Sequence, residues 1–425
     1  MNSKRLMSID FLRGLAIIVL VFIHRIHYNW TGMRSDDTVK DYMSGPLLPI
    51  LIFLILLLSM AGIFYYLTGI VNAYTIQKRI ESGQNSWKQT MIFGFFGGIW
   101  LLILNYIQRL FFMNGFLVGK DGGTPEFPVG YLTGLIRNPD QVKFYWQQFT
   151  EPGTLSLIGI LIITISIILS LLMSFRKKLN LSKIQLVIFG LAIAALFSSI
   201  FVKLYVTPLY ENYFSNGQYF KAMLCGHLCL DFSLAPYLGY ALIGAASGLG
   251  LAYGESRKIY KRKSVLTALG LILMGILIFL FFDKEKFGGR GTMGAMVSLV
   301  ELGIFILFLL VLLKRFDYCG KEKREKRRIR TKWVRRFGML SLTVFILEPI
   351  LAEILKKAID FVIGTTWNNH LILVTVFAGI CLFTWHLLLI LWQKVLFKGS
   401  FEWLTAWLLL KLAGKKSGKI NFKEL

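Results

Sequence analysis

The chain has few charged residues, few prolines and few cysteines for its length. Charged residues make up 17% of 425 residues, and Asp and Glu number 23 against 48 Lys and Arg. Soluble domains average about 25% charged and about 45–50% apolar residues, whereas here 55% are hydrophobic and mean hydropathy is +0.61. This composition excludes a soluble globular protein, a disordered chain and a collagen-like chain. Four cysteines are too few for a disulfide framework.

Long apolar runs predict an all-α integral membrane protein. A bilayer span needs about 20 mostly apolar residues, and each span must be helical because lipid offers no partner for backbone polar groups. We predict ten membrane-spanning helices, at residues 11–28, 46–71, 90–113, 155–175, 184–206, 234–253, 264–282, 295–313, 337–359 and 371–392. The stretch after the basic N-terminus contains Arg13 and lacks a small-residue cleavage site, so we interpret it as a retained helix.

The basic residues predict the orientation of these spans. With the N-terminus in the cytoplasm, 34 of the 48 Lys and Arg fall in the inner segments, which is the positive-inside asymmetry. Both termini are then cytoplasmic, in a multi-pass protein of the cell membrane. The net charge of +25 indicates topology and attraction to anionic lipid, not nucleic-acid binding.

The whole chain, residues 1–425, is predicted to form one polytopic domain. It comprises a helical bundle over 11–392, then a short amphiphilic helix at the cytoplasmic interface and a basic tail within 393–425.

Two long segments, 114–154 and 207–233, are predicted on the outer side, where they would serve as lids over a site or as connectors. The basic run at 314–336 contains 12 Lys and Arg. We interpret it either as a solvated loop or as a binding patch for a polyanionic nucleotide cofactor.

The first predicted helix places charged groups inside a span, where they are expensive and often functional. Arg13 and His24 are 11 residues apart, so they lie within about 20° of one face and roughly 16 Å apart along the axis. Asp10 lies one turn before Arg13 and His27 one turn after His24. Gly14 permits close approach of another helix or a ligand. Alone, Arg13 would be interpreted as a snorkelling anchor and His24 as an interfacial residue.

This stripe suits transfer of a group across the bilayer. A neutral imidazole can take a proton from a hydroxyl or amine, and a guanidinium can bind a phosphate or a polarised carbonyl. An acyl donor on a long cofactor arm, entering from the cytoplasm, would place its anionic head near the inner basic loops. His24 would then lie where an outer acceptor arrives.

Further polar residues are weaker candidates. Glu348 lies within a predicted span and needs a partner, such as Arg109, unless it lines the acceptor site. Arg109 is either an interfacial anchor or an acceptor contact, and His227 is a further acceptor-side candidate. The Cys and His residues around His227 do not match a common zinc spacing, so no metal is expected. No Walker, Rossmann or kinase motif is present.

Four stretches resemble transmembrane acyltransferases, a superfamily that includes the acyltransferase-3 enzymes and the heparan-α-glucosaminide N-acetyltransferase-like enzymes. The first-helix pattern is similar to their first helix, and three further stretches are similar to their later motifs. The residues that carry the resemblance are Arg5, Ser8, Ile9, Asp10, Arg13, Gly14 and His24, then FSLAPYLGYALIGAASG at 232–248, RRFGMLSLTVFILEPIL at 335–351 and GSFEWL at 399–404.

The resemblance implies an enzyme that moves an acyl group, most often acetyl, from cytoplasmic acetyl-CoA to an extracytoplasmic glycan or other small acceptor. It assigns the acyl-CoA side to Arg13 with Asp10, and catalysis to His24. His27 stays open as a second catalytic candidate, because heparan-type enzymes carry their histidine in the following outer loop. Arg109, Glu348 and His227 are the expected acceptor-binding residues. Membrane lipids and a second copy of the chain, in a homodimer, are the other expected partners.

Two other functions fit the same residues. Buried Arg, His and Glu in ten spans suit a proton-coupled secondary transporter of a small anion or lipid-linked sugar. The absence of a visible internal repeat in the sequence disfavours the transporter. A non-catalytic scaffold is the third interpretation.

Overall fold

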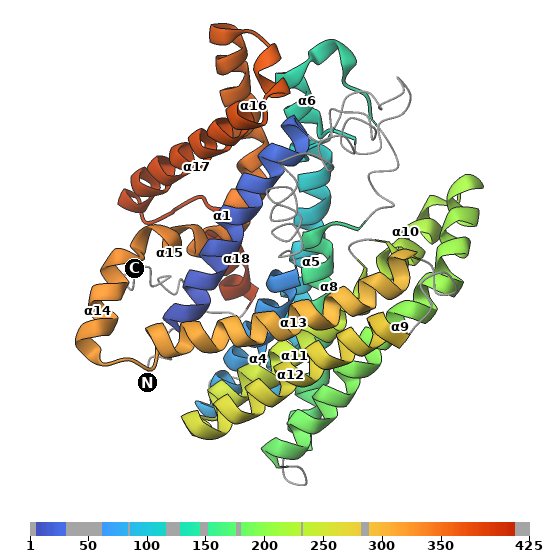
Figure 1. Ribbon diagram of the computed structural model, residues 1–425, viewed down its shortest axis with the longest axis vertical. Coiled ribbons are helices and arrows are strands. Elements are labelled where there is room, and N and C mark those ends of the chain that lie inside the picture. The colour runs from blue at the N-terminus through green and yellow to red at the C-terminus, as the bar shows by residue number, and fades with distance from the viewer. Residues whose placement is uncertain are drawn as a thin grey trace. The chain divides into compact units, whose positions relative to one another are not determined.

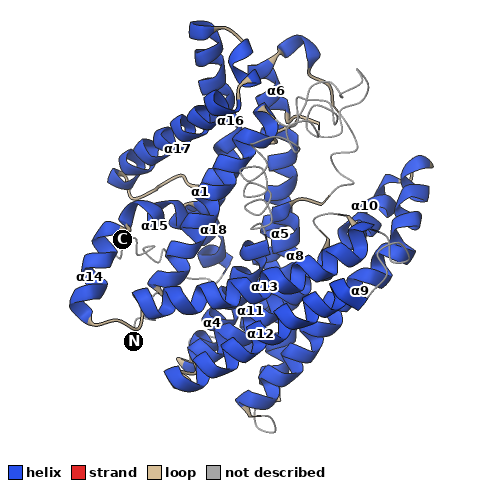
Figure 2. Ribbon diagram, viewed as in Figure 1, coloured by secondary structure: helices blue, strands red, loops and turns tan. Residues whose placement is uncertain are grey.

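The computed structural model describes residues 6–30, 62–83, 86–115, 128–144, 152–175, 180–230, 233–281 and 289–412, with backbone only over 289–296. Within these ranges the regular structure consists of helices (Figures 1 and 2). The all-α architecture predicted from the apolar runs is therefore confirmed for the described part of the chain. The predicted basic tail after residue 412 and residues 46–61 of the predicted second span lie outside the described residues.

Among the described residues, eight helices are long and apolar enough to cross a membrane, and a bent pair would make nine. The eight correspond to predicted spans, and they are Met7–Asn29, Trp87–Phe112, Thr154–Ser174, Leu181–Val202, Leu234–Ala252, Arg257–Phe281, Val297–Phe316 and Leu371–Lys394. The bent pair, Lys332–Met339 and Ser341–Ile363, turns by 87° inside the predicted ninth span. A multi-pass membrane protein thus fits the described helices.

The chain divides into two compact units. Unit 1 contains Met1–Ile9, Gly62–Asn105 and Phe149–Gly320, and unit 2 contains Asp10–Ala61, Tyr106–Gln148 and Lys321–Leu425. The helices of unit 1 are α4 (Gly62–Glu81), most of α5 (Trp87–Ile107), α8 (Thr154–Ser174), α9 (Leu181–Ser215), α10 (Tyr219–Cys229), α11 (Leu234–Ala252), α12 (Arg257–Phe281) and α13 (Gly289–Phe316).

Small residues let α4 and α11 pack backbone to backbone at the centre of unit 1. A Cβ atom added to Gly69 would lie 1.9 Å from the carbonyl oxygen of Ala241, and one added to Gly244 would lie 2.1 Å from that of Tyr66. In lipid there is no hydrophobic driving force that brings helices together. Helices therefore commonly associate through close van der Waals packing, which glycine permits by letting the two backbones approach. The same chemistry recurs in unit 2.

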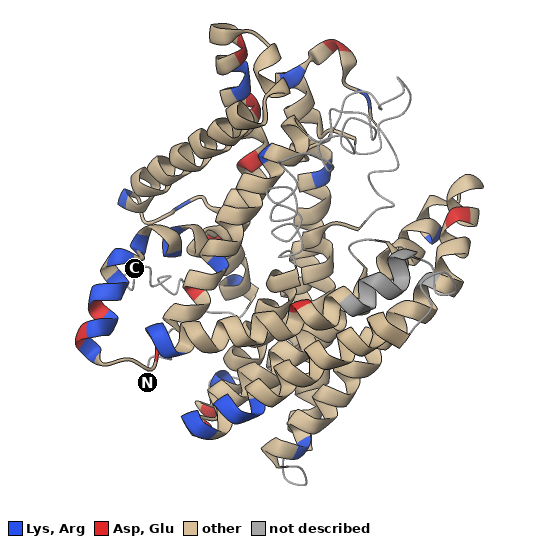
Figure 3. Ribbon diagram, viewed as in Figure 1, with Lys and Arg blue, Asp and Glu red and all other residues tan. Residues whose placement is uncertain are grey.

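Unit 2 contains most of α1 (Met7–Asn29) and further helices from the middle and the end of the chain. They are η2 (Gln108–Phe112), α6 (Tyr131–Arg137), η3 (Pro139–Gln141), α14 (Lys321–Arg330), α15 (Lys332–Met339), α16 (Ser341–Ile363), η4 (Thr366–Asn369), α17 (Leu371–Lys394) and α18 (Phe401–Leu412). Figure 3 shows that Lys and Arg gather on α14. The helix α16 contacts η2, α6, α15, α17 and α18, so it is the central element of this unit.

Gly14 was predicted to allow a close approach, and α15 makes that approach. A Cβ atom on Gly14 would lie 2.0 Å from the carbonyl oxygen of Val334, and one on Gly338 would lie 2.2 Å from that of Asp10. The two glycines therefore lock α1 against α15, directly beside Arg13.

Replacing Gly14 with valine is expected to destabilise the protein by about 1–3 kcal/mol, because the added carbons cannot fit without moving α15. The measurement is thermal unfolding of the purified protein in detergent. Gly379→Val in α17 is the matched control, because nothing lies within 4 Å of a Cβ added there. An unfolding temperature for Gly14→Val equal to that of the control would contradict the packing described for α1 and α15.

The predicted outer segment 207–233 is largely helical, which corrects its interpretation as a loop. The helix α9 runs through Pro208 to Ser215, and α10 follows after a short turn. Gly217 has a φ of +69° in that turn, a conformation that costs glycine little. The two helices contact each other, and Phe214 packs against both Tyr210 and Tyr219. The contact of Phe214 with Tyr219 therefore joins α9 to α10.

The C-terminal helix α18 caps the start of α16. Leu340, the residue before α16, makes no side-chain capping bond. Instead the carboxylate of Glu402 accepts hydrogen bonds from the backbone N–H of Leu342 at 2.6 Å and of Thr343 at 3.2 Å, and lies 2.5 Å from the Thr343 hydroxyl. A negative group at a helix N-terminus accepts hydrogen bonds from the free N–H groups and is attracted to the positive end of the helix dipole. These hydrogen bonds attach α18, the predicted interfacial helix, to the N-terminus of α16.

Glu402→Ala is expected to lower stability by about 1–3 kcal/mol, because two partly buried N–H groups lose their acceptor. Burial raises the pKa of the Glu402 carboxyl, against the effect of the hydrogen bonds from Thr343 and Leu342. The folded state therefore tolerates the protonated form, and Glu402→Gln, which resembles that form, should retain most of the stability. Thermal unfolding distinguishes the variants, with the exposed Glu322→Ala as control. Equal losses in the alanine and glutamine variants would contradict the capping role.

Candidate functional site

The last two turns of α1 carry a cluster of polar side chains in unit 2. His24 is accessible over 26% of its side chain, whereas Arg25 beside it is accessible over 1%. The ring of Tyr28 lies edge-on to both histidines, with centroids 5.7 Å from His24 and 4.9 Å from His27. The helix remains regular here because its apolar residues, including Val21, Ile23 and Ile26, are buried.

Glu348 on α16 joins His24 and Arg25. Its carboxylate forms an ion pair with Arg25 Nη2, and its Oε2 atom lies 3.4 Å from Nδ1 of His24. The Glu348 side chain is accessible over 2% of its surface. A buried carboxylate is strongly destabilising without a partner, so the guanidinium of Arg25 is the group that allows an ionised carboxylate at this depth in α16.

Asn114, just after η2, completes the contacts of this carboxylate. Its Nδ2 donates a hydrogen bond to Glu348 Oε2 at 3.0 Å, and its Oδ1 accepts one from Arg25 Nη2 at 3.0 Å. The amide therefore bridges the two charged groups and fixes the orientation of both. Asn114 is 4% exposed. Residues from three separate parts of the sequence thus build one polar cluster, His24, Arg25, Asn114 and Glu348, which we call the histidine–glutamate cluster.

This arrangement determines what the imidazole can do. A carboxylate facing Nδ1 favours the tautomer that carries its proton there, which leaves Nε2 as the basic nitrogen. Orientation of a histidine by a buried carboxylate is the geometry that lets an imidazole act as general base in acyl transfer. His24 is also the most accessible of the three charged residues in the cluster. The cluster can therefore take a proton from a hydroxyl or amine that reaches His24.

A second ion pair lies further along α16. Arg137, the last residue of α6, pairs with Glu353 and donates a hydrogen bond to the carbonyl oxygen of Gly115. Arg109 and Arg137 also interact electrostatically with Tyr28, as do Arg25 and Glu348. Arg109 lies in η2 and is 5% exposed, so it is not a lipid-facing anchor. Within the predicted outer segment 114–154, the described residues 114–115 and 128–144 therefore belong to unit 2, which contains the cluster.

At the other end of α1, Asp10 lies one turn before Arg13 as predicted. The carboxylate Oδ1 is 4.0 Å from Arg13 Nη2, and the Arg13 side chain is 30% accessible. The neighbouring α15 contributes Arg335, which is 4% exposed and donates a hydrogen bond to the carbonyl oxygen of Arg328 at 3.3 Å. The helix α14 before it has seven Lys and Arg, two Glu and no buried residue. Arg13 thus belongs to the same unit as a strongly basic, accessible helix.

The structure therefore brings most of the predicted residues into unit 2. His24, His27, Arg109 and Glu348 lie around the second half of α1 and the helix α16, while Asp10 and Arg13 lie in the first half of α1. His227 lies on α10 in unit 1, with a ring nitrogen 2.7 Å from the carbonyl oxygen of Met223. Its position on a helix, bonded to that helix's own backbone, gives no support for an acceptor contact.

Sequence reasoning missed Arg25, Asn114 and Arg137. Glu348 was expected to pair with a cation such as Arg109, and the ion pair seen for it is with Arg25. The signal was present, since a charged residue beside His24 inside an apolar helix must find a partner. Asn114 gave no signal, because a single amide at a predicted helix end carries no recognisable pattern.

Within the described ranges, no group of three or more His, Cys, Asp or Glu side chains is arranged to hold a metal ion. No family model, no curated protein and no solved structure matches this chain.

Proposed function

We propose that this protein is a membrane-embedded acyltransferase that moves an acyl group, most often acetyl, from cytoplasmic acyl-CoA to a hydroxyl or amine of an extracytoplasmic acceptor, with a cell-envelope glycan as the first candidate. The observation that carries the proposal is the contact of His24 with the buried, ion-paired Glu348. An oriented imidazole that is still accessible suits proton transfer.

In the proposed reaction, His24 carries the proton from the acceptor to the leaving CoA thiolate. The acceptor O–H or N–H gives its proton to Nε2, and its oxygen or nitrogen attacks the thioester carbonyl carbon. The C–S bond then breaks, and the CoA thiolate takes the proton back from the imidazolium. Glu348 stabilises the imidazolium during the step, because a carboxylate faces its Nδ1–H. His27, which packs on Tyr28, remains the second candidate for the base.

The donor would bind from the cytoplasmic side, with its phosphates against basic residues of the inner segments. Arg13, held near Asp10, would contact the donor at the inner end of α1, and the accessible Lys and Arg of α14 would attract the nucleotide. The proposed orientation, with both termini in the cytoplasm, follows from the distribution of basic residues.

Acetyl-CoA-dependent thermal stabilisation of the purified protein tests this function. A ligand that binds only the folded state raises the unfolding temperature with its concentration. We expect stabilisation by acetyl-CoA in the wild type and in His24→Ala, and a reduced shift in Arg13→Gln. If acetyl-CoA leaves the unfolding temperature of all three proteins unchanged, the proposed acyl donor is wrong. That result would favour the rival function, a proton-coupled transporter built on the same buried Arg, His and Glu.

A further inference from the structure

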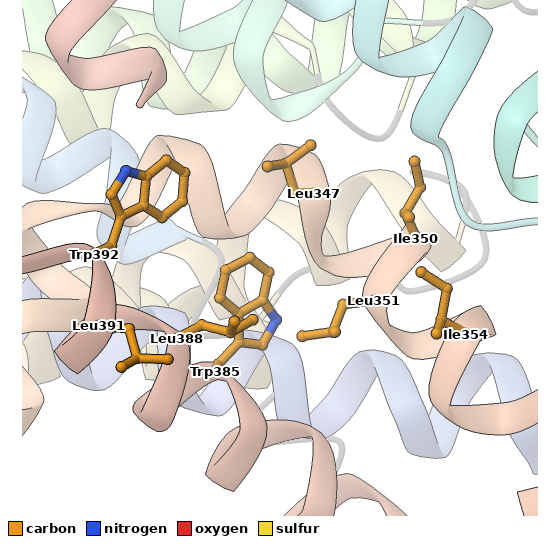
Figure 4. Close-up of a pocket in the computed structure, with 8 residues that line it drawn as sticks. All are labelled: Leu347, Ile350, Leu351, Ile354, Trp385, Leu388, Leu391 and Trp392. Atoms are coloured by element: carbon orange, nitrogen blue, oxygen red, sulfur yellow. The ribbon is translucent and has the colours of Figure 1, made fainter. Parts of the chain in front are cut away.

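A groove with apolar walls lies between α16 and α17 of unit 2 (Figure 4). Its volume is about 410 Å³, within the range of about 300–1,000 Å³ found for ligand sites. Four residues come from each helix, and they are Leu347, Ile350, Leu351 and Ile354 of α16 and Trp385, Leu388, Leu391 and Trp392 of α17. Almost all of the accessible wall is carbon. An apolar chain therefore fits these walls and a polar substrate does not.

The groove and the histidine–glutamate cluster use different faces of α16. The groove residues of α16 follow the spacing of one helical stripe. Glu348 and Glu353 are almost fully buried. They flank this stripe, one on each side and each about 110° from its centre, since each residue turns the helix by about 100°. Ile354 and Leu391 are 51% and 57% exposed, so the groove is open along its side. Its occupant would therefore reach it without passing His24.

Basic residues adjoin one end of the groove. Trp392 lies at this end near Leu347 (Figure 4), and its indole N–H donates a hydrogen bond to the carbonyl oxygen of Lys398 at 2.8 Å. The next residue, Gln393, accepts a hydrogen bond from Arg336 Nε at 2.7 Å, and Lys394 follows it. An indole with adjoining Lys and Arg is typical of the membrane interface, where such residues attract anionic lipid headgroups.

We propose that this groove binds one acyl chain of an anionic glycerophospholipid, whose phosphate lies against Arg336, Lys394 and Lys398. The apolar walls account for the chain, and the basic end accounts for the headgroup. A second copy of the protein is the less favourable occupant, because it carries a net charge of +25 and would add positive charge to this end. The site does not depend on the proposed acyl transfer.

The test is native mass spectrometry of the full-length protein after equilibration with vesicles containing equal amounts of phosphatidylglycerol and phosphatidylcholine. The wild type should retain phosphatidylglycerol over phosphatidylcholine by at least about fivefold, the factor expected for one basic residue near an anionic lipid surface. Arg336→Gln combined with Lys394→Gln and Lys398→Gln, which removes all three basic residues, should retain both lipids equally. Leu351→Trp, which fills the groove, should retain neither above background.

Two further variants keep the test decisive. Leu391→Trp changes a groove residue that is 57% exposed, so it should block the chain even where Leu351→Trp disturbs packing. Leu373→Trp, on α17 outside the groove and 41% exposed, is the control and should retain lipid like the wild type. Unchanged retention of phosphatidylglycerol in both groove variants, or equal retention of the two lipids by the wild type, would overturn the proposal. Loss of a dimer mass in the groove variants would assign the groove to a second copy instead.

Discussion

Replacing His24 with alanine is expected to lower kcat for acetyl transfer by about 10²–10⁴-fold, the usual contribution of a general base. The side chain is partly accessible, and Glu348 keeps its ion pair with Arg25 when the imidazole is removed, so the fold should stay intact. The measurement is transfer of labelled acetyl from acetyl-CoA to an envelope-glycan fraction. Binding of acetyl-CoA, measured by thermal stabilisation, should change little, because the variant removes proton transfer and not the donor site.

His27→Ala is the matched control for this experiment. The residue lies one turn further along α1 and contacts Tyr28, but the contact with Glu348 is made by His24. We expect His27→Ala to retain activity within about tenfold of the wild type. The reverse ranking of the two variants would move the base to His27 and leave the His24–Glu348 contact with a structural role.

Removing the Glu348 carboxylate is expected to have the largest effect on stability. Glu348→Ala leaves the guanidinium of Arg25, which is 1% accessible, without its counter-charge. Breaking a buried pair in this way costs about 3–5 kcal/mol. Denaturant or thermal unfolding in detergent measures this loss. Acetyl transfer should fall as well, because the His24 ring loses the group that orients it.

A combined variant separates the two effects. Arg25→Met and Glu348→Met remove both charges, and Asn114→Leu removes the buried amide that would otherwise lose both of its partners. Replacing a buried ion pair by apolar side chains of similar volume is often neutral or stabilising. We expect it to recover most of the stability lost in Glu348→Ala, while activity stays low. Recovery of both stability and activity would show that Glu348 acts only through folding and would contradict its role in orienting His24.

The fold was predictable from the sequence to the extent that hydropathy determines it. Eight of the predicted spans match helices of sufficient length, because lipid requires long apolar helices whatever the tertiary structure. The break between α15 and α16 was not predictable, because it depends on Glu402 of α18 capping the N-terminus of α16. The extension of α9 beyond Pro208 was missed as well, since it is supported by a contact between helices, that of Phe214 with Tyr219 of α10.

The site was predictable where its residues share one helix. Arg13, Asp10, Gly14 and His24 all belong to α1, and helical periodicity places them without tertiary information. The partners of His24 and Arg25 could not be located in this way. Glu348 is 324 residues away from His24 in the sequence, and Asn114 is 234 residues from Glu348. Contacts over such separations depend on helix packing, which periodicity does not specify.

The central claim is that this chain catalyses acyl transfer with His24 as the base. Its most direct test uses sealed vesicles in which the protein is reconstituted, with labelled acetyl-CoA supplied on the side of the termini and envelope glycans on the other side. The account predicts label in the glycan fraction with wild-type protein, and background label with a His24→Ala protein that still binds acetyl-CoA. Equal labelling by the two proteins, or label that never leaves CoA with the wild type, would contradict it.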